Sequence, residues 1–188
     1  MIHYLFKTKH FIPNAHHPTI YDIDFQKLYQ EGIRLLLIDL DNTLIPYDQT
    51  IPNADLHDFF AGLHHLGFET IIVSNNHKPR VKLFADALEA KFIASAKKPF
   101  KTGFKKAIKQ SENTYAQDQI CVIGDQLMTD VFGAKRLKLS AILVLPIKKK
   151  SEKWYTKFNR ILENKILKRI KKKHGTLYQN LDLEKRYG

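Results

Sequence analysis

The sequence contains a single cysteine, Cys121, which lies inside an apolar run and has no second cysteine for an internal disulfide. We therefore expect a reduced, cytoplasmic protein in which Cys121 is a small buried hydrophobe. No uninterrupted apolar stretch approaches the roughly 18–20 residues that a helix needs to span a membrane. The first residues also lack an apolar segment of secretory length, so we expect no signal peptide.

No Pro-, Gly- or Ser-rich linker and no internal repeat divides the 188 residues. A chain of this length forms one domain of ordinary size. We predict a core with an N-terminal strap over residues 1–147, and a basic, amphipathic, helical extension of the same domain over residues 148–188. Five histidines have no other metal-ligating residues as company, and we expect no metal site at them: His10, His16, His17, His64 and His65.

Acidic residues are scarce in only one segment, and this makes the net charge of +12 uneven. Residues 148–174 contain twelve Lys or Arg residues and two acidic residues, Glu152 and Glu163. The rest of the chain has 19 basic and 17 acidic residues and is nearly neutral. The basic character is therefore a property of the extension rather than of the core.

Short apolar runs alternate with segments of helical periodicity. This alternation predicts βαβ units and an α/β fold of three layers, with a central parallel sheet and right-handed crossovers. Residues 1–30 predict an irregular strap and a short helix that ends near Gly32. The predicted strands cover residues 34–39, 70–74, 119–124 and 141–145, with 91–94 as a weaker fifth. The predicted helices cover residues 54–66, 79–90, 100–110 and 130–137.

Asp39 and Asp41 end the most apolar predicted strand, in the string Leu-Ile-Asp-Leu-Asp-Asn-Thr-Leu. Side chains two residues apart leave a strand on the same face, and ligands bind at the carboxyl edge of an open α/β sheet. Two like charges held there repel each other, and a hard divalent cation such as Mg²⁺ relieves that repulsion. A simple turn after a buried strand also uses Asp and Asn, but it does not require the whole string.

Three further polar strings fall where later strands are predicted to end. Ser74 and Asn75 offer a hydroxyl and backbone N–H groups at a helix start, which suits a phosphate. Lys98 offers a point charge just beyond the next strand. Asp125 and Asp130 follow a glycine that allows close backbone approach, and the two acids can face the same metal.

In this order the four strings resemble the motifs of the haloacid dehalogenase (HAD) superfamily of phosphohydrolases, and specifically the YqeG-type phosphatases of subfamily IIIA. The resemblance covers about residues 12–170. It implies a HAD-like, Rossmann-like fold and a Mg²⁺-dependent phosphatase that works through an aspartyl-phosphate. A helix and a strand fill the 32 residues between Asp41 and Ser74, and again the 23 between Ser74 and Lys98. We therefore predict no large cap domain.

The resemblance also implies a role for each motif residue. Asp39 is the nucleophile and Asp41 the general acid/base, while Ser74 binds the phosphoryl group and Lys98 orients and neutralises it. Asp125 binds Mg²⁺, and Asp130 supports it. The predicted substrate-binding residues are Thr43, Ser74, Asn75 and Lys98, and the predicted metal ligands are Asp39, Asp41, Asp125 and Asp130.

The predicted substrate is a phosphorylated molecule, and its identity stays open. The YqeG type is similar to the mitochondrial and plastid phosphatidylglycerophosphate phosphatases, which makes a phospholipid head group one prediction. An uncapped site suits such a large or surface-presented substrate. A soluble phosphomonoester or a phosphoprotein is the alternative. A ribosome- or RNA-binding protein on a HAD scaffold is the alternative of another class, although a pure binding protein has no physical need of the full acid, hydroxyl and lysine set.

Residues 153–173 predict a helix with one apolar and one basic face. Three interpretations remain open for it. The apolar face packs on the sheet and the lysines are solvated, or the helix lies on an anionic membrane at the inner face, or it contacts RNA or the ribosome. The lysine clusters at 148–150 and 171–173 are compatible with all three. The apolar positions are Tyr155, Phe158, Leu162, Ile166 and Ile170, with Trp154, Ile161 and Leu167 beside them.

Overall fold

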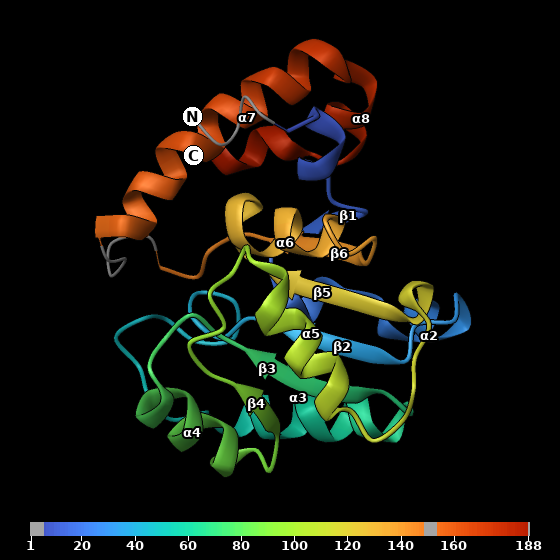
Figure 1. Ribbon diagram of the computed structural model, residues 1–188, viewed down its shortest axis with the longest axis vertical. Helices are drawn as coiled ribbons and strands as arrows, with labels where there is room; N and C mark the ends of the chain where they lie inside the picture. Colours follow the sequence, from blue (N-terminus) through green and yellow to red (C-terminus); the bar gives the residue numbers. More distant parts are fainter. Residues whose placement is uncertain (1–5, 149–153, 188) are drawn as a thin grey trace.

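The structure is a computed structural model, and it describes residues 6–148 and 154–187. The strands in these ranges are β1 (Ala15–His17), β2 (Leu35–Ile38), β3 (Glu69–Val73), β4 (Lys91–Ile93), β5 (Ile120–Gly124) and β6 (Ser140–Val144). They form one central sheet in the order β1-β6-β5-β2-β3-β4, with every neighbouring pair parallel (Figure 1). The α/β prediction with a central parallel sheet is confirmed.

The first strand corrects the prediction that residues 1–30 form only a strap and a short helix. In the sheet, Ala15 lies opposite Ile142 and His17 opposite Val144. All three residues of β1 are half-buried and two are histidines, so no apolar alternation marks the strand in the sequence. The free edge of β6, rather than the local sequence, determines this pairing. The other five strands match the predicted ones to within one residue at each end.

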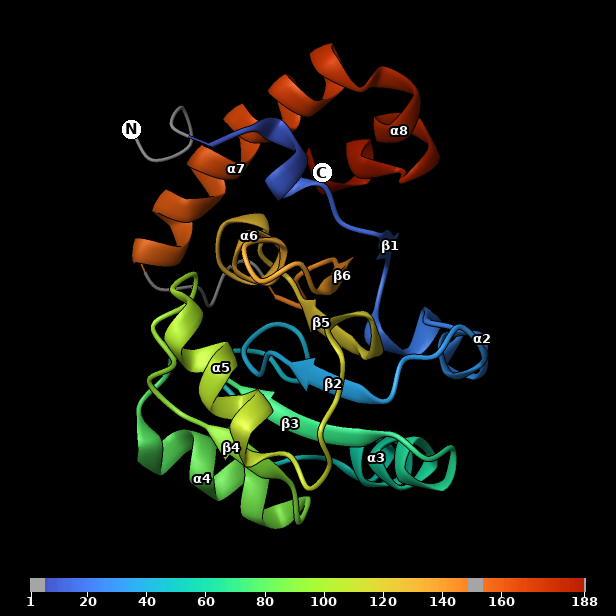
Figure 2. The same cartoon turned by 45° about the vertical axis from the view of Figure 1, so that its right-hand side comes forward.

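Helices cover both faces of the sheet (Figure 2). Their bounds are α2 (Phe25–Gln30), α3 (Ala54–His65), α4 (Lys78–Ala87), α5 (Lys101–Gln110), α6 (Phe132–Lys135), α7 (Trp154–Lys173) and α8 (Gly175–Asn180). Alternate side chains of β2 enter opposite layers: Leu35 and Leu37 face α5, α6 and α7, whereas Leu36 and Ile38 face α2, α3 and α4. The buried core therefore has two halves, one on each side of the sheet.

The connections between the motif-bearing strands are short. Only α3 lies between β2 and β3, and only α4 lies between β3 and β4, so no cap domain is inserted there. Pro79 stands in the first turn of α4, where a missing N–H costs nothing. The predicted helix at 130–137 is shorter than expected, because a π-helical turn, η4 (Leu127–Val131), precedes α6. Helix α8 was not predicted.

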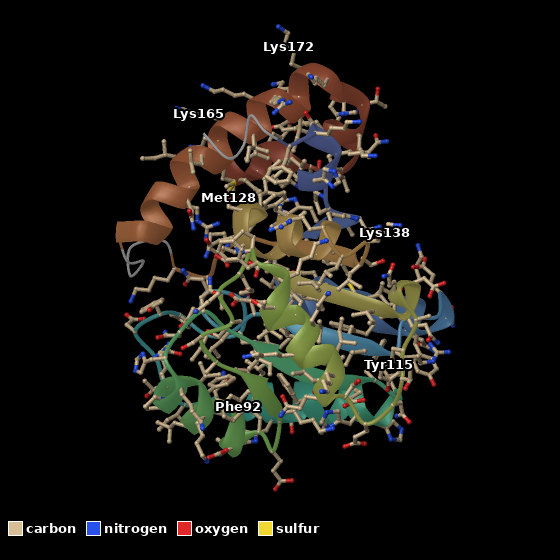
Figure 3. All side chains as sticks on the ribbon, viewed as in Figure 1. Phe92, Tyr115, Met128, Lys138, Lys165 and Lys172 are labelled. Atoms are coloured by element: carbon tan, nitrogen blue, oxygen red, sulfur yellow. The ribbon has the colours of Figure 1, made fainter. Side chains whose placement is uncertain are left out.

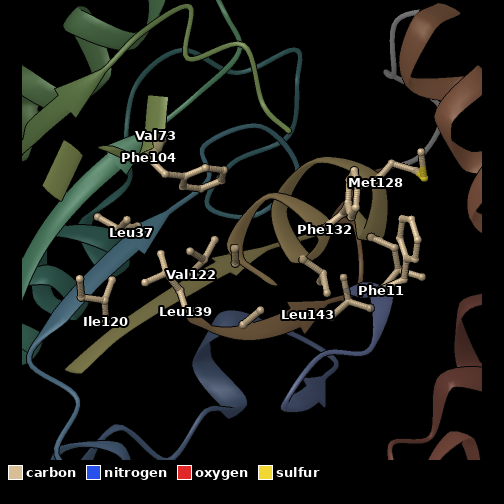
Figure 4. Packing of buried hydrophobic residues seen from close by; sticks show 14 of the residues in the cluster. Phe11, Leu37, Val73, Phe104, Ile120, Val122, Met128, Phe132, Leu139 and Leu143 are labelled. Carbon is tan, nitrogen blue, oxygen red and sulfur yellow. The ribbon is translucent and has the colours of Figure 1, made fainter. Parts of the chain in front are cut away.

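The C-terminal extension packs on the core through α7. Ile166, Leu167 and Ile170 are buried in the same cluster as Phe11 and Phe132. The rings of Phe11 and Phe132 stack with their centroids 4.6 Å apart, and both lie in the packed layer that Figure 4 shows. The packing interpretation of the tail therefore accounts for its buried apolar positions.

The other face of α7 is open to solvent. Lys165 and Lys172 project away from the body (Figure 3), and Ile161 is 56% exposed, so it does not belong to the buried face. This exposed face leaves a membrane or RNA contact open. No helix among the described residues is long and apolar enough to cross a membrane. Lys149, Lys150 and Lys153, and the side chains of Trp154, Tyr155 and Phe158, lie outside what the structure describes.

Candidate active site

The carboxyl edge of the sheet brings Asp39, Lys98 and Asp130 together. The Nζ atom of Lys98 donates to an oxygen of Asp39 and to one of Asp130, each at 2.6 Å. All three residues are buried, although Asp39 and Lys98 come from the loops after β2 and β4 and Asp130 comes from the turn η4 after β5. Parallel strands end at the same edge, so residues far apart in the sequence meet there. One ammonium group thus bridges two carboxylates.

Two of the predicted substrate-binding residues support this group. The hydroxyl of Thr43 donates to Asp39 at 3.3 Å and is buried. The side chain of Asn75 bonds both backbone groups of Lys98: it accepts from the N–H at 2.6 Å and donates to the carbonyl at 3.1 Å. In this structure Asn75 therefore fixes the loop that carries Lys98, while it also lines the cavity described below.

Asp41 belongs to a different set of contacts. Arg80, from α4, donates to one oxygen of Asp41 from Nε at 3.1 Å and from a terminal nitrogen at 2.8 Å. The other oxygen accepts from the hydroxyl of Ser74 at 3.4 Å and from the side chain of Asn76 at 3.1 Å. The strand has ended before Asp41, which forms an isolated bridge to Ile45. Because β2 ends at Ile38, neither aspartate lies inside the strand, and the expectation that their side chains leave one strand on the same face is not met.

Asp130 is held from several sides. Its second oxygen accepts from the backbone N–H of Gln126 and from the hydroxyl of Thr129, both at 3.1 Å. Gly124 at the end of β5 makes room for it, because a Cβ at that position would lie 2.3 Å from the Cγ of Asp130. The glycine of this motif is thus required by a close approach between backbone and carboxylate.

Three buried carboxylates have the arrangement that a metal ion needs. Asp39, Asp125 and Asp130 each offer an oxygen, and these oxygens lie within 4.8 Å of one another. The Oδ1 atom of Asp125 is buried without a hydrogen-bond partner, which is costly unless a ligand satisfies it. Oxygen donors of this kind fit a hard divalent cation. The carboxylate of Asp41, which was also predicted as a ligand, is not part of this cluster.

The electrostatics show that the cluster is short of positive charge. Burial raises the pKa of Asp39 well above its ordinary value, and neighbouring carboxylates add to the effect while Lys98 opposes it. Burial also raises the pKa of Asp125 to about 6, against the influence of Arg160. Burial disfavours the charged form of Lys98, but Asp130 and Asp39 outweigh burial and raise the pKa of Lys98. A bound cation would relieve the carboxylates.

A cavity of about 60 Å³ opens beside these groups, with room for only a few water molecules. The predicted residues that line it are Asp39, Asp41, Ser74, Asn75 and Lys98. The remaining lining residues are Asn42, Tyr47, Asn76, Gln126, Thr129 and Asn159. The cavity accommodates a small polar group, so the rest of a larger molecule must remain outside.

Several residues of the site were not found from the sequence. Arg80 lies in the third position of α4, where a basic residue looks like part of a solvated surface. Asn159 and Arg160 lie in the extension, inside a helix whose basic face suggested a surface contact. Asn76 directly follows the predicted residues Ser74 and Asn75, but nothing in the sequence indicated that it would bond Asp41.

Two comparisons with known proteins cover most of the chain. A family model described as mitochondrial PGP phosphatase matches residues 1–147. This range contains every predicted site residue, and it ends before α7. Probable phosphatase YqeG of Bacillus subtilis (strain 168) is 37% identical over 165 residues, which are 88% of this chain and 94% of the relative.

Solved structures resemble the chain only remotely. The cobalt-bound deoxy-D-mannose-octulosonate 8-phosphate phosphatase of Haemophilus influenzae is 18% identical, with a TM-score of 0.47 over 76% of this chain and 90% of that chain. The 3-deoxy-D-manno-octulosonate 8-phosphate phosphatase of Moraxella catarrhalis, in complex with magnesium, phosphate and KDO, is 22% identical. Its TM-score is 0.40, over 54% of this chain and 64% of that chain.

Proposed function

The chain belongs to the mitochondrial PGP phosphatase family and is a phosphatase of the HAD type, and from that premise we propose that it hydrolyses a phosphomonoester through an aspartyl-phosphate at Asp39. The 37% identity to YqeG confirms the resemblance that the motifs suggested. One observation carries the proposal: Asp39 lines the small polar cavity and contacts Lys98 at 2.6 Å. A carboxylate nucleophile thus stands beside a cation that can neutralise a phosphate.

The proposed reaction has two displacements. An oxygen of Asp39 attacks phosphorus, the bond from phosphorus to the leaving oxygen breaks, and Asp41 gives that oxygen a proton. Asp41 then takes a proton from water, whose oxygen attacks phosphorus and releases phosphate and the free Asp39 carboxylate. Ser74 and Lys98 bind the phosphoryl oxygens, while Thr43 and Asn75 hold Asp39 and the Lys98 loop in place. Asp39 and Asp41 have different hydrogen-bond partners, which suits one carboxylate to attack phosphorus and the other to transfer protons.

We propose Mg²⁺ as the cofactor, held by Asp39, Asp125 and Asp130. The unpartnered Oδ1 of Asp125 and the raised pKa values of Asp39 and Asp125 support this choice of ligands. When bound, the ion supplies positive charge that offsets the repulsion between the Asp39 carboxylate and a phosphate dianion. Asp41 stays available for proton transfer, since Arg80, Ser74 and Asn76 already orient its carboxylate.

The proposed substrate is phosphatidylglycerophosphate or another phosphomonoester presented by an anionic membrane surface. The cavity holds little more than the phosphoryl group, so the bulk of the substrate must lie outside the protein. The loops after β2, β4 and β6 leave the same carboxyl edge of the sheet that carries the cavity, and each holds an exposed apolar residue. These residues form the apolar rim: Ile51, Phe100 and Ile147, which are 65%, 62% and 50% exposed.

Exposed lysines accompany the apolar rim. Lys97 and Lys101 lie on either side of Phe100 in the sequence, and Lys148, which pairs with Asp48 at 2.5 Å, follows Ile147. Apolar side chains with lysines beside them are suited to the interface of an anionic membrane, where each cation near the leaflet contributes about 1 kcal/mol. The rim is therefore a second proposed membrane contact. The first is the exposed basic face of α7, which carries Lys165, Lys168, Lys171, Lys172 and Lys173.

A substrate panel tests the proposed chemistry. Phosphatidylglycerophosphate in vesicles, sugar phosphates, nucleotides and phosphopeptides are each incubated with Mg²⁺ and with EDTA. We expect release of phosphate that is fastest on the lipid, requires the metal and is lost in Asp39→Asn. Turnover by Asp39→Asn near the wild-type rate would reject the aspartyl-phosphate. Equal rates on the lipid and on a soluble ester would reject the surface-presented substrate.

Vesicle flotation tests the two proposed membrane contacts. One variant carries Ile51→Ser, Phe100→Ser and Ile147→Ser, and a second carries Gln in place of Lys168, Arg169, Lys171, Lys172 and Lys173. If α7 is the membrane contact, losing five cations should weaken binding to anionic vesicles by several orders of magnitude. If the apolar rim is the contact, the rim variant should lose binding. Tyr21→Ser, an exposed apolar residue outside the rim, is the control.

Retention on RNA separates the remaining alternative, because salt weakens binding to vesicles and to RNA alike. We expect wild-type protein to float with anionic vesicles and to ignore RNA. Protein that ignores these vesicles, yet binds RNA through the five residues of α7, would reject the membrane contact. Both variants should retain wild-type activity on a small soluble ester.

A further inference from the structure

The C-terminal extension reaches the metal-ligand candidate Asp125 with two arginines. Arg160, from α7, donates to the carbonyl oxygen of Asp125 at 2.8 Å and pairs with its Oδ2 atom. Arg186, from the final turn η6 (Leu183–Tyr187), donates to the same carbonyl at 2.6 Å. Both the backbone and the side chain of Asp125 are thus held from outside the range that the family model matches.

Glu163 connects the two arginines. One of its oxygens accepts from Nε of Arg186 at 2.7 Å, and the other accepts from Arg160 at 3.3 Å and from the backbone N–H of Leu127 at 3.3 Å. Arg186 also donates to the carbonyl of Val144 at the end of β6 at 2.7 Å. We call Asp125, Glu163, Arg160 and Arg186 the extension network.

The extension network is buried and balanced in charge. Asp125 is 0% exposed, Glu163 2% and Arg186 7%, and the Arg160 side chain is 17% exposed, so water screens their interactions little. Two carboxylates face two guanidinium groups, and such a buried group is stable only when each member is paired. The network therefore fixes the position of Asp125 relative to β6 and α7.

The two oxygens of the Asp125 carboxylate have different surroundings. Oδ2 is paired with Arg160, whereas Oδ1 is buried and has no hydrogen-bond partner. The carboxylate belongs to the cluster with Asp39 and Asp130, whose oxygens Lys98 bridges. One oxygen is thus clamped and the other is left for a ligand.

We propose that Arg160 is a positioning residue for the divalent metal, and that the extension completes the metal site by holding Asp125 with Oδ1 presented to the ion. This inference rests on the proposed metal-dependent function. It also gives the C-terminal extension a second role, since Arg160 and Arg186 act inside the protein. The exposed lysines among its described residues are Lys148, Lys165, Lys168, Lys171, Lys172, Lys173 and Lys185. A competing role for Arg160 predicts the opposite change in metal affinity. If the guanidinium group merely occupied the place of the metal ion, removing it would tighten metal binding.

Metal binding to the full chain tests the proposal without relying on activity. Mg²⁺ and Mn²⁺ are titrated calorimetrically into wild-type protein, Arg160→Gln, Arg160→Lys and the control Lys168→Gln, which removes a charge from an exposed position of the same helix. We expect Arg160→Gln to weaken binding at least tenfold, Arg160→Lys to recover part of the loss, and Lys168→Gln to stay within twofold of wild type.

The outcomes separate this inference from the proposed function. Wild-type protein that binds neither ion overturns both. Wild-type binding together with unchanged or tighter binding by a folded Arg160→Gln overturns only the positioning role. Circular dichroism in EDTA establishes whether the variants are folded. If Arg160→Gln does not fold, the metal titration relies on Arg160→Lys, which keeps the positive charge. Weaker binding by Arg160→Lys than by Arg160→Gln would likewise contradict the proposal, because the variant that keeps the cation should be the better one.

Discussion

Two neighbouring regions of buried charge meet at Asp125, and their balance differs. At the strand edge, Lys98 faces the carboxylates of Asp39 and Asp130, and no second lysine or arginine among the described residues bonds either of them. In the extension, Glu163 faces the guanidinium groups of Arg160 and Arg186. The strand edge has one carboxylate more than it has cations, whereas the extension has one cation more than it has carboxylates until Asp125 is counted with it.

This difference in charge distinguishes the proposed metal site at the strand edge from the extension that holds Asp125 in place. Buried like charges cost free energy unless a ligand relieves them, so a surplus that persists in the fold is typical of a functional site. In the extension, by contrast, Glu163 is paired with both Arg160 and Arg186, and Arg160 also pairs with Asp125. Removing a carboxylate should therefore have opposite effects on stability in the two regions.

Removal of Glu163 should give the largest effect. In Glu163→Gln, Arg160 and Arg186 lose the carboxylate between them, and breaking a buried pair in this way costs about 3–5 kcal/mol. We expect the free energy of unfolding in urea to fall by that amount. The control Glu184→Gln, at an exposed position of the same extension, should change it by less than about 0.5 kcal/mol. A loss below about 1 kcal/mol for Glu163→Gln would show that this region is not held by its charges.

Removal of a carboxylate from the strand edge should act in the opposite direction. In EDTA, Asp39→Asn should raise the free energy of unfolding by about 1–3 kcal/mol, because the amide relieves a carboxylate whose pKa burial has raised. Mg²⁺ should then stabilise wild-type protein more than the variant. Asp118→Asn, an exposed aspartate, is the matched control. An Asp39→Asn variant less stable than wild type in EDTA would remove the contrast between the regions.

Arg80 tests whether the strand edge also depends on precise orientation. Arg80→Gln should lower kcat on a soluble ester about 10–100-fold, because Asp41 loses the guanidinium that fixes one of its oxygens. Arg80→Lys should recover little, since an ammonium group cannot reproduce the two contacts. The melting temperature of Arg80→Gln should stay close to that of wild-type protein, although its kcat falls. Wild-type kcat in a folded Arg80→Gln would show that Ser74 and Asn76 suffice to orient Asp41.

The smallest effect concerns pH and the seam between β1 and the extension. His16 bonds the carbonyl of Leu181 at 2.9 Å, and burial, followed by the charge of Arg186, lowers the pKa of His16 to about 4. The unfolded chain therefore binds more protons than the folded protein between about pH 4 and 6.5, so stability falls as pH decreases through that window.

Thermal unfolding at pH 7.5 and pH 5 measures this contribution. The melting temperature of wild-type protein should fall a few degrees further than that of His16→Gln, which cannot titrate. His57→Gln, at an exposed position, should behave like wild type. Identical falls for wild type and His16→Gln would show that His16 does not couple β1 to pH.

Most of the sheet and the motif residues could be predicted from the sequence, because each is marked locally. Five strands are apolar runs that match their predicted bounds to within one residue, and the motif acids follow them directly. Strand β1 and helix α8 could not be predicted in this way. Both are short and poor in apolar periodicity, and they form where β6 and α7 offer a surface to pair with or pack on.

Apart from β1 and α8, the sequence by itself determined which strands and helices follow one another along the chain, the absence of a cap between β2 and β4, and the residues that stand at each strand's end, because these follow from patterns a few residues long. The tertiary structure alone decided which charges became partners. It placed Arg80 on Asp41, 39 residues away, and Arg160 and Arg186 on Asp125, 35 and 61 residues away. A local pattern marks a basic residue as charged, but only packing determines whether that charge is buried beside a carboxylate or left in water.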